Sequence, residues 1–465
     1  MTIEQIYTGC LAQGAYYIES EGEAAVIDPL RDYQNYVTRA AAGKAKLRYI
    51  FETHFHADFV SGHLDLAEAT GAKIIYGPGA KTTYDKHEAQ DGERFQLGKV
   101  SIEVLHTPGH TMESSCYLLR DEGGKAHALF TGDTLFIGDV GRPDLSQPNS
   151  GITQEMQAGM LYDSLRAKIM PLPDDVIIYP AHGAGSACGK KMSRETQDTL
   201  GSQKASNYAL RADMTREEFI EEVTEGLLPP PAYFSENARL NQEGYGSIET
   251  ALNQGLVALN PEQFEHIANR EHALILDVRD KAAFVKGFIP NSIFIGLDGS
   301  FAPWVGAMIP DLKQPILLVV PPGREEEAVT RLARVGFDNV LGYLDLSSDL
   351  HPWTSSGREL DQLDTIDATA LQQRDLETEQ AIMLDLRKPG EWNGGHLSYA
   401  INRPLNFLNE SMRELDAHQT YYLHCGSGYR STIAGSILKS RGFEKLINVQ
   451  DKVADILATE AAETA

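Results

Sequence analysis

Short apolar runs, punctuated by Gly, Pro and Asp, dominate the first quarter of the chain. Such short runs are typical of β-strands that are buried in a sheet. Apolar residues that recur every three or four positions predict helices over 33–42, 63–70 and 153–169. The predicted strands are 15–18, 24–27, 48–52, 73–76, 100–105, 116–119, 128–131 and 176–179. This order predicts layered sheets with helices on the outside.

After residue 250 the pattern repeats itself. LILDVRDKAAFVKGFIPNSI at 274–293 aligns with IMLDLRKPGEWNGGHLSYAI at 382–401, at an offset of 108. Each copy alternates strand and helix, as a small parallel α/β unit does. We therefore predict a multi-domain chain of mixed α/β and α+β class, whose last two domains are copies of each other. The predicted domains are 1–250, 255–355 and 362–465.

Composition and charge narrow the classes of partner. The 465 residues suggest about three domains at roughly 150 residues each. The formal net charge of −25 repels phosphate backbones and anionic lipid, so we expect neither nucleic acid nor membranes as partners. No apolar run approaches the roughly 18 residues of a spanning helix, and the N-terminus does not resemble a signal peptide. Four cysteines without a CxxC pair indicate a reducing compartment, and we expect the cytoplasm.

Histidines and aspartates gather directly after the predicted strands. The first group lies in THFHADF at 53–59 and contains His54, His56 and Asp58. The groups that follow later strands are His110 in HTPGHT, Asp133 in LFTGD and His182 in IIYPAHG. A single histidine is more often structural than a ligand, but a folded sheet brings such strand ends together at one rim. The sequence therefore predicts a metal site there.

These motifs, HxHxD, PGH, TGD and PAH, resemble the metallo-β-lactamase fold in its glyoxalase II and persulfide dioxygenase branch. The resemblance covers about residues 1–250 and implies an αββα sandwich. In the hydrolytic relatives the first motif continues as HxHxDH, and its last histidine helps to hold a second metal. Phe59 stands at that position here. A phenyl ring cannot bind a metal, which argues against a full dinuclear zinc site.

The persulfide dioxygenases hold one iron with two histidines and one aspartate. By motif position the resemblance assigns these roles to His54, His110 and Asp133 and implies one Fe(II) per chain. Such a set leaves three positions open for O2 and substrate. Zinc stays open as the alternative metal because the Irving–Williams order favours it over iron. The residues expected to orient ligands and substrate by hydrogen bonds are His56, Asp58 and His182.

Two weaker features lie in the same domain. GDVGRPDL at 138–145 resembles the GRxD segment of the dioxygenases, which makes Arg142 and Asp144 candidates for a pair near the iron. A surface turn with a salt bridge is an equal alternative. For Cys188, in a Gly-rich loop, we prefer the interpretation of a small buried residue; a thiol that accepts sulfur is the alternative.

The second copy contains YLHCGSGYRS at 422–431, a predicted strand, loop and helix start. Backbone N–H groups of such a loop form an anion-binding nest at a helix N-terminus, and together with Arg430 they favour a thiolate at Cys425. This segment and LDLRKPGEWNGGHL resemble a rhodanese domain over about 362–460. Cys425 and Arg430 are five positions apart, one fewer than in related phosphatases, which favours sulfur transfer. The resemblance implies that Cys425 carries sulfur as a persulfide.

The first copy lacks both the cysteine and the anion-binding loop. It reads LLVVPPGREEE at 317–327, and no cysteine occurs between 189 and 424. Pro321 and Pro322 also remove two backbone donors from the loop. We therefore interpret this domain as an inactive rhodanese that serves as a spacer or docking surface.

Together the motifs resemble the fusions of a persulfide dioxygenase with two rhodanese domains. The resemblance implies oxidation of a low-molecular-weight thiol persulfide by O2 to sulfite and thiol, with sulfur transfer that forms or uses thiosulfate. We also expect a homo-oligomer. One alternative is a zinc-dependent thioester hydrolase of glyoxalase II type, against which Phe59 and the rhodanese domains argue. A non-enzymatic sulfur-relay or docking protein with a structural metal is the other.

Overall fold

The computed structural model describes residues 1–145, 151–346 and 350–463. It divides into two compact units. The first unit comprises Met1–Ile248 together with Ala333–Gly336, and the second comprises Glu249–Leu332 and Phe337–Ala465. The second unit contains both copies of the internal repeat. Over the described ranges, every helix is too short or too polar to cross a membrane.

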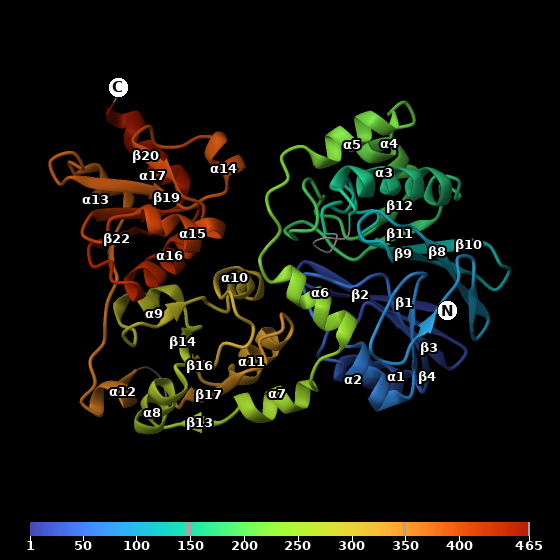
Figure 1. Cartoon of the computed structure of the whole chain (residues 1–465), viewed down its shortest axis with the longest axis horizontal. Coiled ribbons are helices and arrows are strands. Elements are labelled where there is room, and N and C mark those ends of the chain that lie inside the picture. Colours follow the sequence, from blue (N-terminus) through green and yellow to red (C-terminus); the bar gives the residue numbers. More distant parts are fainter. Residues whose placement is uncertain (146–150, 347–349, 464–465) are drawn as a thin grey trace. The chain divides into compact units, whose positions relative to one another are not determined.

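Two six-stranded sheets form the first unit (Figure 1). The first sheet contains, in spatial order, β1 (Thr2–Thr8), β2 (Gln13–Ser20), β3 (Glu23–Ile27), β4 (Lys46–Glu52), β5 (Lys73–Tyr76) and β6 (His87–Glu88). The second contains β12 (Asp198–Thr199), β11 (Ile177–Pro180), β10 (Ala126–Gly132), β9 (Ser115–Arg120), β8 (Val100–His106) and β7 (Arg94–Leu97). Strands β3 to β6 are parallel, as are β10 and β11, and the other pairs are antiparallel.

The two sheets pack face to face through aromatic side chains. Phe51 of β4 contacts Tyr117 of β9 with ring centroids 4.8 Å apart, and Tyr16 of β2 contacts Phe130 of β10 at 4.9 Å. All four side chains are buried. Aromatic side chains bury a large apolar area each, so this layer stabilises the pairing of the sheets.

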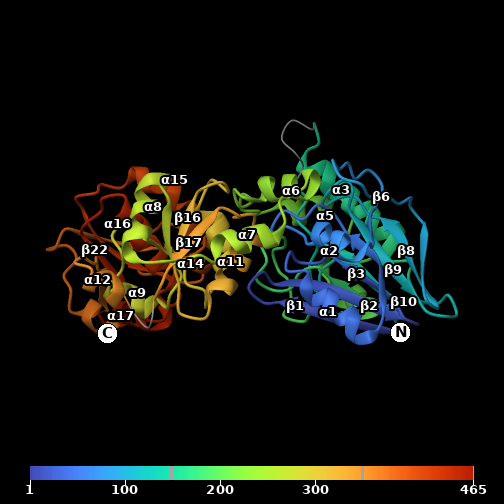
Figure 2. The same ribbon diagram turned by 90° about the horizontal axis from the view of Figure 1, so that it is seen from below.

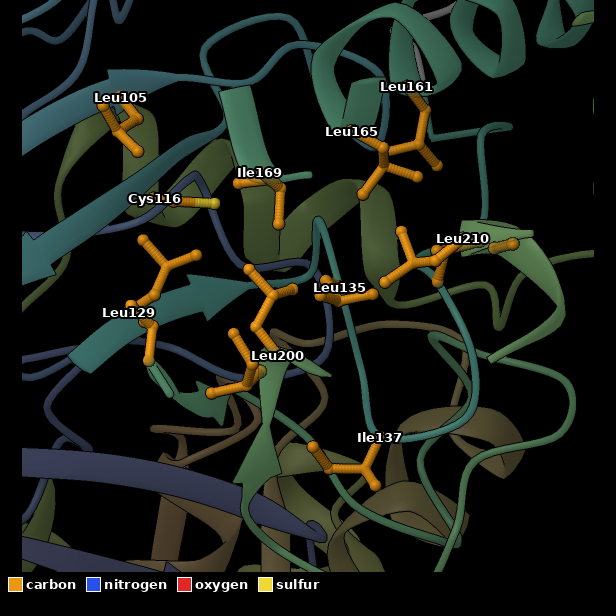
Figure 3. Close-up of a cluster of buried hydrophobic side chains, with 14 of the residues drawn as sticks. Leu105, Cys116, Leu129, Leu135, Ile137, Leu161, Leu165, Ile169, Leu200 and Leu210 are labelled. Carbon is orange, nitrogen blue, oxygen red and sulfur yellow. The ribbon is translucent and has the colours of Figure 1, made fainter. Parts of the chain in front are cut away.

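Helices cover the outer faces. The first sheet carries α1 (Gln34–Gly43) and α2 (His63–Thr70), which lie in front of the strands when the unit is seen from below (Figure 2). The second carries α3 (Gln154–Ser164), its π-helical extension (Leu165–Ile169), α4 (Leu200–Ser206) and α5 (Arg216–Thr224). Leu161 and Leu165 pack with Leu129 of β10 and Leu200 of α4 in one apolar cluster (Figure 3). The predicted αββα sandwich is confirmed.

The apolar runs predicted the buried strands but missed strands with polar positions. Strand β1 escaped prediction because its residues are exposed or half-buried at the edge of the sheet. Strand β7 is short and exposes every second residue. Two further helices end the first unit and lead to the second, α6 (Phe234–Glu243) and α7 (Ile248–Gly255).

The second unit contains two five-stranded parallel sheets with matching strand order. The first repeat has β13 (Ala258–Leu259), β17 (Val340–Leu344), β16 (Ile316–Val319), β14 (Leu274–Asp277) and β15 (Ile293–Phe294). The second has β18 (Asp364–Ile366), β22 (Leu446–Val449), β21 (Thr420–His424), β19 (Ala381–Asp385) and β20 (Ala400–Asn402). Their helices are α8 (Pro261–Glu271), α9 (Lys281–Lys286), α10 (Phe301–Met308), α11 (Glu325–Ala333) and α12 (His351–Ser355), then α13 (Ala368–Gln372), α14 (Pro389–Asn393), α15 (Leu408–Ser411), α16 (Tyr429–Ser440) and α17 (Val453–Glu463). The predicted duplication of a small parallel α/β domain is confirmed.

The aligned Asp–Arg pairs have the same structural role in both copies. Arg279 donates to both oxygens of Asp277 and to the carbonyl of Gly287, at 2.6–3.0 Å. Arg387 makes the matching contacts with Asp385 and Gly395. Each buried carboxylate is thus compensated, as a stable core requires.

Leu161→Ala should lower the free energy of unfolding of the first unit by about 2–5 kcal/mol, because it leaves a cavity in the cluster of Figure 3. Met156→Ala on the same helix should change it by less than about 0.5 kcal/mol, since Met156 is 47% exposed. Hydrogen exchange of peptides from β10 measures this unit alone. Equal protection in both variants would contradict the packing described.

Candidate functional site

The predicted strand-end residues gather at one rim of the first unit, and all of them are buried. They lie in the segments after β4, β8, β10 and β11. Ligand atoms of His54, His110 and Asp133 all lie within 4.8 Å of one another. We call these three residues the ligand cluster.

The ligand cluster has the donor set and the unsatisfied atoms of a metal site. Asp133 Oδ2 lies 3.3 Å from His110 Nε2 and 4.0 Å from His54 Nε2. Within the part of the chain that the structure describes, His110 Nε2 and both Asp133 oxygens have no hydrogen-bond partner. Leaving such buried atoms unpaired costs free energy, so the site fits a bound cation. Two imidazoles and one carboxylate suit Fe(II) or zinc.

Neighbouring hydrogen bonds orient both imidazoles. His110 Nδ1 donates to the carbonyl of Arg142 at 2.8 Å, which leaves the Nε2 lone pair toward Asp133. His54 Nδ1 lies 3.0 Å from Thr53 Oγ1, whose own proton goes to Asp28 Oδ2 at 2.9 Å. His54 Nδ1 therefore donates, and its Nε2 also presents a lone pair. Burial, followed by repulsion from three neighbouring histidines, lowers the pKa of His54 well below its ordinary value, so the ring is neutral.

His56 turns to a different set of groups. Its Nε2 lies 3.0 Å from Asp28 Oδ1 and 3.5 Å from Glu52 Oε2. Burial disfavours the charged ring, but the attraction of these carboxylates outweighs it and raises the pKa of His56 to about 9. These contacts with two carboxylates favour the expected hydrogen-bonding role. Asp28 follows β3 and shows the same strand-end pattern, which would have identified it.

Asp58 and His182 form a pair next to the ligand cluster. His182 Nε2 lies 3.4 Å from Asp58 Oδ2 and 3.6 Å from Asp133 Oδ1. Its Nδ1 lies 3.3 Å from the carbonyl of Ala12, which only accepts. Burial, partly offset by His182, and repulsion from Asp133 raise the pKa of Asp58. These two residues are therefore placed to orient whatever binds at Asp133.

Phe59 occupies the position of the missing histidine. Its side chain is fully buried, and its ring stacks on His56 with centroids 4.3 Å apart. The His182 ring lies at an interplanar angle of 68° to it, with centroids 6.5 Å apart. Asn241 of α6 donates to the carbonyls of His56 and Phe59, at 2.8 Å each, and accepts from the N–H of Ser61. Sequence reasoning missed Asn241 because nothing in its local pattern distinguishes it.

The structure places Arg142 and Asp144 in an ion pair, in which Arg142 is buried and Asp144 is half-buried. Nε and Nη2 of Arg142 donate to the two Asp144 oxygens at 2.6 and 2.7 Å. The same guanidinium donates to the carbonyls of Ala187 and Leu228. Arg142 thus holds three segments together while its own carbonyl orients His110. The guanidinium donates its hydrogen bonds to groups of the protein itself, so it is not placed to bind a substrate.

Cys188 lies inside the site region rather than at an exposed mouth. Its side chain is buried, and its sulfur lies within 4.8 Å of ligand atoms of Asp133 and His182. Burial, followed by the charges of Asp58 and Asp133, raises the pKa of Cys188 well above its ordinary value. The group is therefore a thiol at neutral pH, which favours the small-buried-residue interpretation.

The cysteine of the second repeat lies between β21 and α16, as predicted. Cys425 is buried, and its thiol donates to Ser431 Oγ at 3.6 Å. Arg430 makes a two-pronged ion pair with Glu391 of α14, at 2.6 and 2.7 Å. This hydrogen bond lowers the pKa of Glu391. Glu391 was missed by sequence reasoning, although it lies within the LRKPGEW segment.

Strand register identifies what replaces the cysteine in the first repeat. Asp277 pairs with Val319, and Asp385 pairs with His424 in the matching strands. Val320 therefore takes the place of Cys425 and is buried. An alkyl side chain cannot act as a nucleophile.

Family profiles match both units. The Metallo-beta-lactamase superfamily matches residues 8–182, and the Rhodanese-like domain matches 260–348 and 367–452. A probable hydroxyacylglutathione hydrolase of Schizosaccharomyces pombe is 36% identical over 169 residues, which are 35% of this chain and 60% of that protein. The chain thus spans less than two thirds of this relative's length.

Solved structures are similar as well. A metallo-beta-lactamase from Staphylococcus aureus subsp. aureus COL is 32% identical, with a TM-score of 0.65; the match covers 74% of this chain and 98% of that one. That share is larger than the first unit, so the likeness extends into the second. ETHE1 from Myxococcus xanthus is 28% identical, with a TM-score of 0.45, over 52% of this chain and 98% of that one.

His110→Ala and Asp133→Ala should each remove most of the bound metal, because each deletes one of three ligands. His56→Ala should retain more metal, since His56 faces Asp28 and Glu52. His127→Ala, on the partly exposed part of β10, is the control and should bind as the parent does. Metal per chain is measured by plasma mass spectrometry. Equal loss in the His56 and His110 variants would contradict the assignment.

Proposed function

Because the chain belongs to the metallo-beta-lactamase superfamily and carries two rhodanese-like domains, we propose that it oxidises a low-molecular-weight thiol persulfide with O2 and transfers sulfane sulfur through Cys425. The observation that carries this proposal is Phe59. Its ring lies against His56 and near His182, where a hydrolase would hold a second metal. The ligand cluster meanwhile keeps its full donor set, which suits a single iron.

The proposed oxidation is RSSH + O2 + H2O → RSH + SO3²⁻ + 2 H⁺. Fe(II), when bound, supplies open positions on one face for O2 and a persulfide sulfur. The chain's own residues prepare this face. The Arg142 carbonyl and the Thr53 hydroxyl direct the two imidazoles, and Asp133 contributes the only negative charge of the ligand cluster. A divalent ion in that set keeps a net positive charge, which attracts a persulfide anion.

A zinc-dependent thioester hydrolase is the second candidate function. The hydroxyacylglutathione hydrolase relative favours it. So do Asp58 and His182, because His182 Nε2 lies 3.4 Å from Asp58 and 3.6 Å from Asp133. Zinc, if held by His54, His110 and Asp133, would supply Lewis-acid chemistry for the hydrolysis of a thioester. Phe59 and the cysteine loop of the second repeat favour the oxidation instead.

The second step of the proposal takes place at Cys425. Its loop lies at the N-terminus of α16, and Gly428 starts this helix with a φ of +84°, which favours glycine. Backbone N–H groups there suit an anionic sulfur species. The first repeat has Val320 at this position and is proposed to be inactive in transfer.

The proposed small-molecule partners are a thiol persulfide, O2, and sulfite or thiosulfate. All four cysteines, each in a described segment, are free, which suits a reducing compartment such as the cytoplasm. The homo-oligomer expected above stays a prediction.

Protein produced with iron should contain about one iron per chain and consume O2 when a thiol persulfide is added, with sulfite as product. Metal analysis, an oxygen electrode and ion chromatography measure these quantities. Two zinc ions per chain with thioesterase activity and no O2 uptake would refute the proposal and support the hydrolase.

Phe59→His should raise metal binding toward about two ions per chain in zinc, because it restores a ligand near Asp58 and His182. Phe59→Leu is the matched control: it also removes the stacked ring but adds no ligand, and it should stay near about one ion. Titration with zinc and a competing chelator measures both. If Phe59→His gains nothing over Phe59→Leu, Phe59 is not what limits the site to one metal.

Cys425→Ser should abolish sulfur transfer while O2 uptake largely persists, because a hydroxyl stays protonated at neutral pH. Without transfer onto sulfite, the product should shift from thiosulfate toward sulfite. Chromatography of both anions, corrected for the non-enzymatic reaction, measures the shift. Thiosulfate at the parent rate would show that another group carries the sulfur.

A further inference from the structure

A pocket of about 380 Å³ in the second unit is lined by residues of both repeats. From the second repeat come Ser427, in the loop that carries Cys425, and Tyr429, the first residue of α16. The first repeat contributes Lys281 of α9, among others. A repeat without its own cysteine therefore forms part of the surroundings of its neighbour's cysteine.

Hydrogen bonds anchor the first repeat to this loop. The Lys281 ammonium donates to the carbonyl of Ser427, two residues from Cys425. The Tyr429 hydroxyl donates to the carbonyl of Gly296 at 2.7 Å. Contact is so close that a Cβ on Gly428 would lie 3.0 Å from the Lys281 nitrogen. The ammonium thus lies against the middle of the loop.

Lys281 is the cation of this pocket that no carboxylate neutralises. Arg279 is paired with Asp277, and Asp298 is paired with Arg324. For Lys281, no ion pair within 4.0 Å exists among the residues that the structure describes. An ammonium has three donors, and Ser427 uses one of them.

One carboxylate, Asp280, remains in the pocket. It is exposed to water and accepts a hydrogen bond from the N–H of Ala282 at the start of α9, at 2.7 Å. Water and the helix N-terminus both screen its charge. Lys281 is therefore the group best placed to attract an anion to the loop.

The aligned position of the second repeat shows that this lysine is particular to the first. The offset of 108 that aligns Asp277 with Asp385 aligns Lys281 with Pro389. The two copies thus differ in a complementary way: one has the cysteine, and the other has the cation that touches its loop.

We propose that Lys281 binds the SO3 group of the sulfite or thiosulfate that reacts at Cys425, which makes the first repeat part of the sulfur-transfer site. The inference rests on the transfer activity proposed above. In that step the Cys425 thiolate attacks the outer sulfur of thiosulfate, the S–S bond breaks, and its electron pair leaves with sulfite: Cys–S⁻ + S–SO3²⁻ → Cys–S–S⁻ + SO3²⁻. The reverse step returns the sulfur to sulfite. Lys281 is a specificity-determining residue that holds the anion.

The test uses the full chain and kinetics of sulfur transfer from thiosulfate. Lys281→Met should raise the KM for thiosulfate about tenfold, the equivalent of about 1.4 kcal/mol, with kcat within about twofold. Lys281→Arg should restore most of the binding, because it keeps the charge. Lys286→Met, at the exposed end of the same helix, should behave as the parent. The KM for an uncharged thiol acceptor such as dithiothreitol should not change.

Alkylation of Cys425 supplies a readout that needs no transfer activity. Iodoacetate carries a negative charge and iodoacetamide does not, so Lys281→Met should lower the ratio of their rates at Cys425. An unchanged ratio, with an unchanged KM for thiosulfate, overturns the inference even where Cys425→Ser shows that the transfer function is correct. Equal losses toward thiosulfate and dithiothreitol, with the ratio unchanged, show a purely structural role and also overturn it. Absence of transfer in the parent refutes the proposed function, while the alkylation ratio still decides whether Lys281 attracts anions to the loop.

Discussion

Asp133 ends β10 with a buried carboxylate, and neither of its oxygens accepts a hydrogen bond from any residue that the structure describes. Burial of such a charge costs several kcal/mol unless a cation compensates it. The atoms of the ligand cluster nearest to this carboxylate are Nε2 of His54 and Nε2 of His110, each of which carries a lone pair. A metal ion satisfies all of these atoms at once. The charge of this carboxylate therefore explains why so many ligand-type residues occupy the interior of the first unit.

The surrounding structure keeps these groups in place by close packing. A Cβ on Gly109 would lie 2.4 Å from the Cα of Leu161, and this glycine has a φ of +147°. A Cβ on Gly141 would lie 2.0 Å from the carbonyl of Asp133. The loops that carry the ligands thus pass too near to α3 and to each other for any side chain. Asn241, from a helix outside both sheets, holds the loop after β4 by three hydrogen bonds.

The two repeats share one buried ion pair and differ in the loop that carries the cysteine in the second repeat. Both keep a buried aspartate compensated by an arginine two residues later, because an uncompensated carboxylate at that depth would destabilise either sheet. The loop after β16 in the first repeat and after β21 in the second differs between the copies. In one copy it carries Cys425, and in the other it carries Val320, which packs as core. Contacts within the second unit then place Lys281 of the altered copy on the loop of the other.

The sequence by itself determined that layered sheets carry helices on the outside, that an α/β domain is duplicated, and to which rim the ligand residues belong; the αββα order came from the family resemblance of the motifs. The pattern-based features follow from apolar periodicity, from the internal repeat and from the position of polar residues at strand ends, all of which can be read along the chain. Only the tertiary structure decided how the rim residues divide. His54 faces Asp133 after β10, whereas His56 faces Asp28 after β3 and Glu52 of its own strand β4. The same holds for Asn241 with its loop and for Arg430 with Glu391. The contacts of Asn241 and Arg430 join residues separated by 39 to 185 positions. No local pattern encodes them; they arise where packed layers bring distant segments within hydrogen-bonding distance.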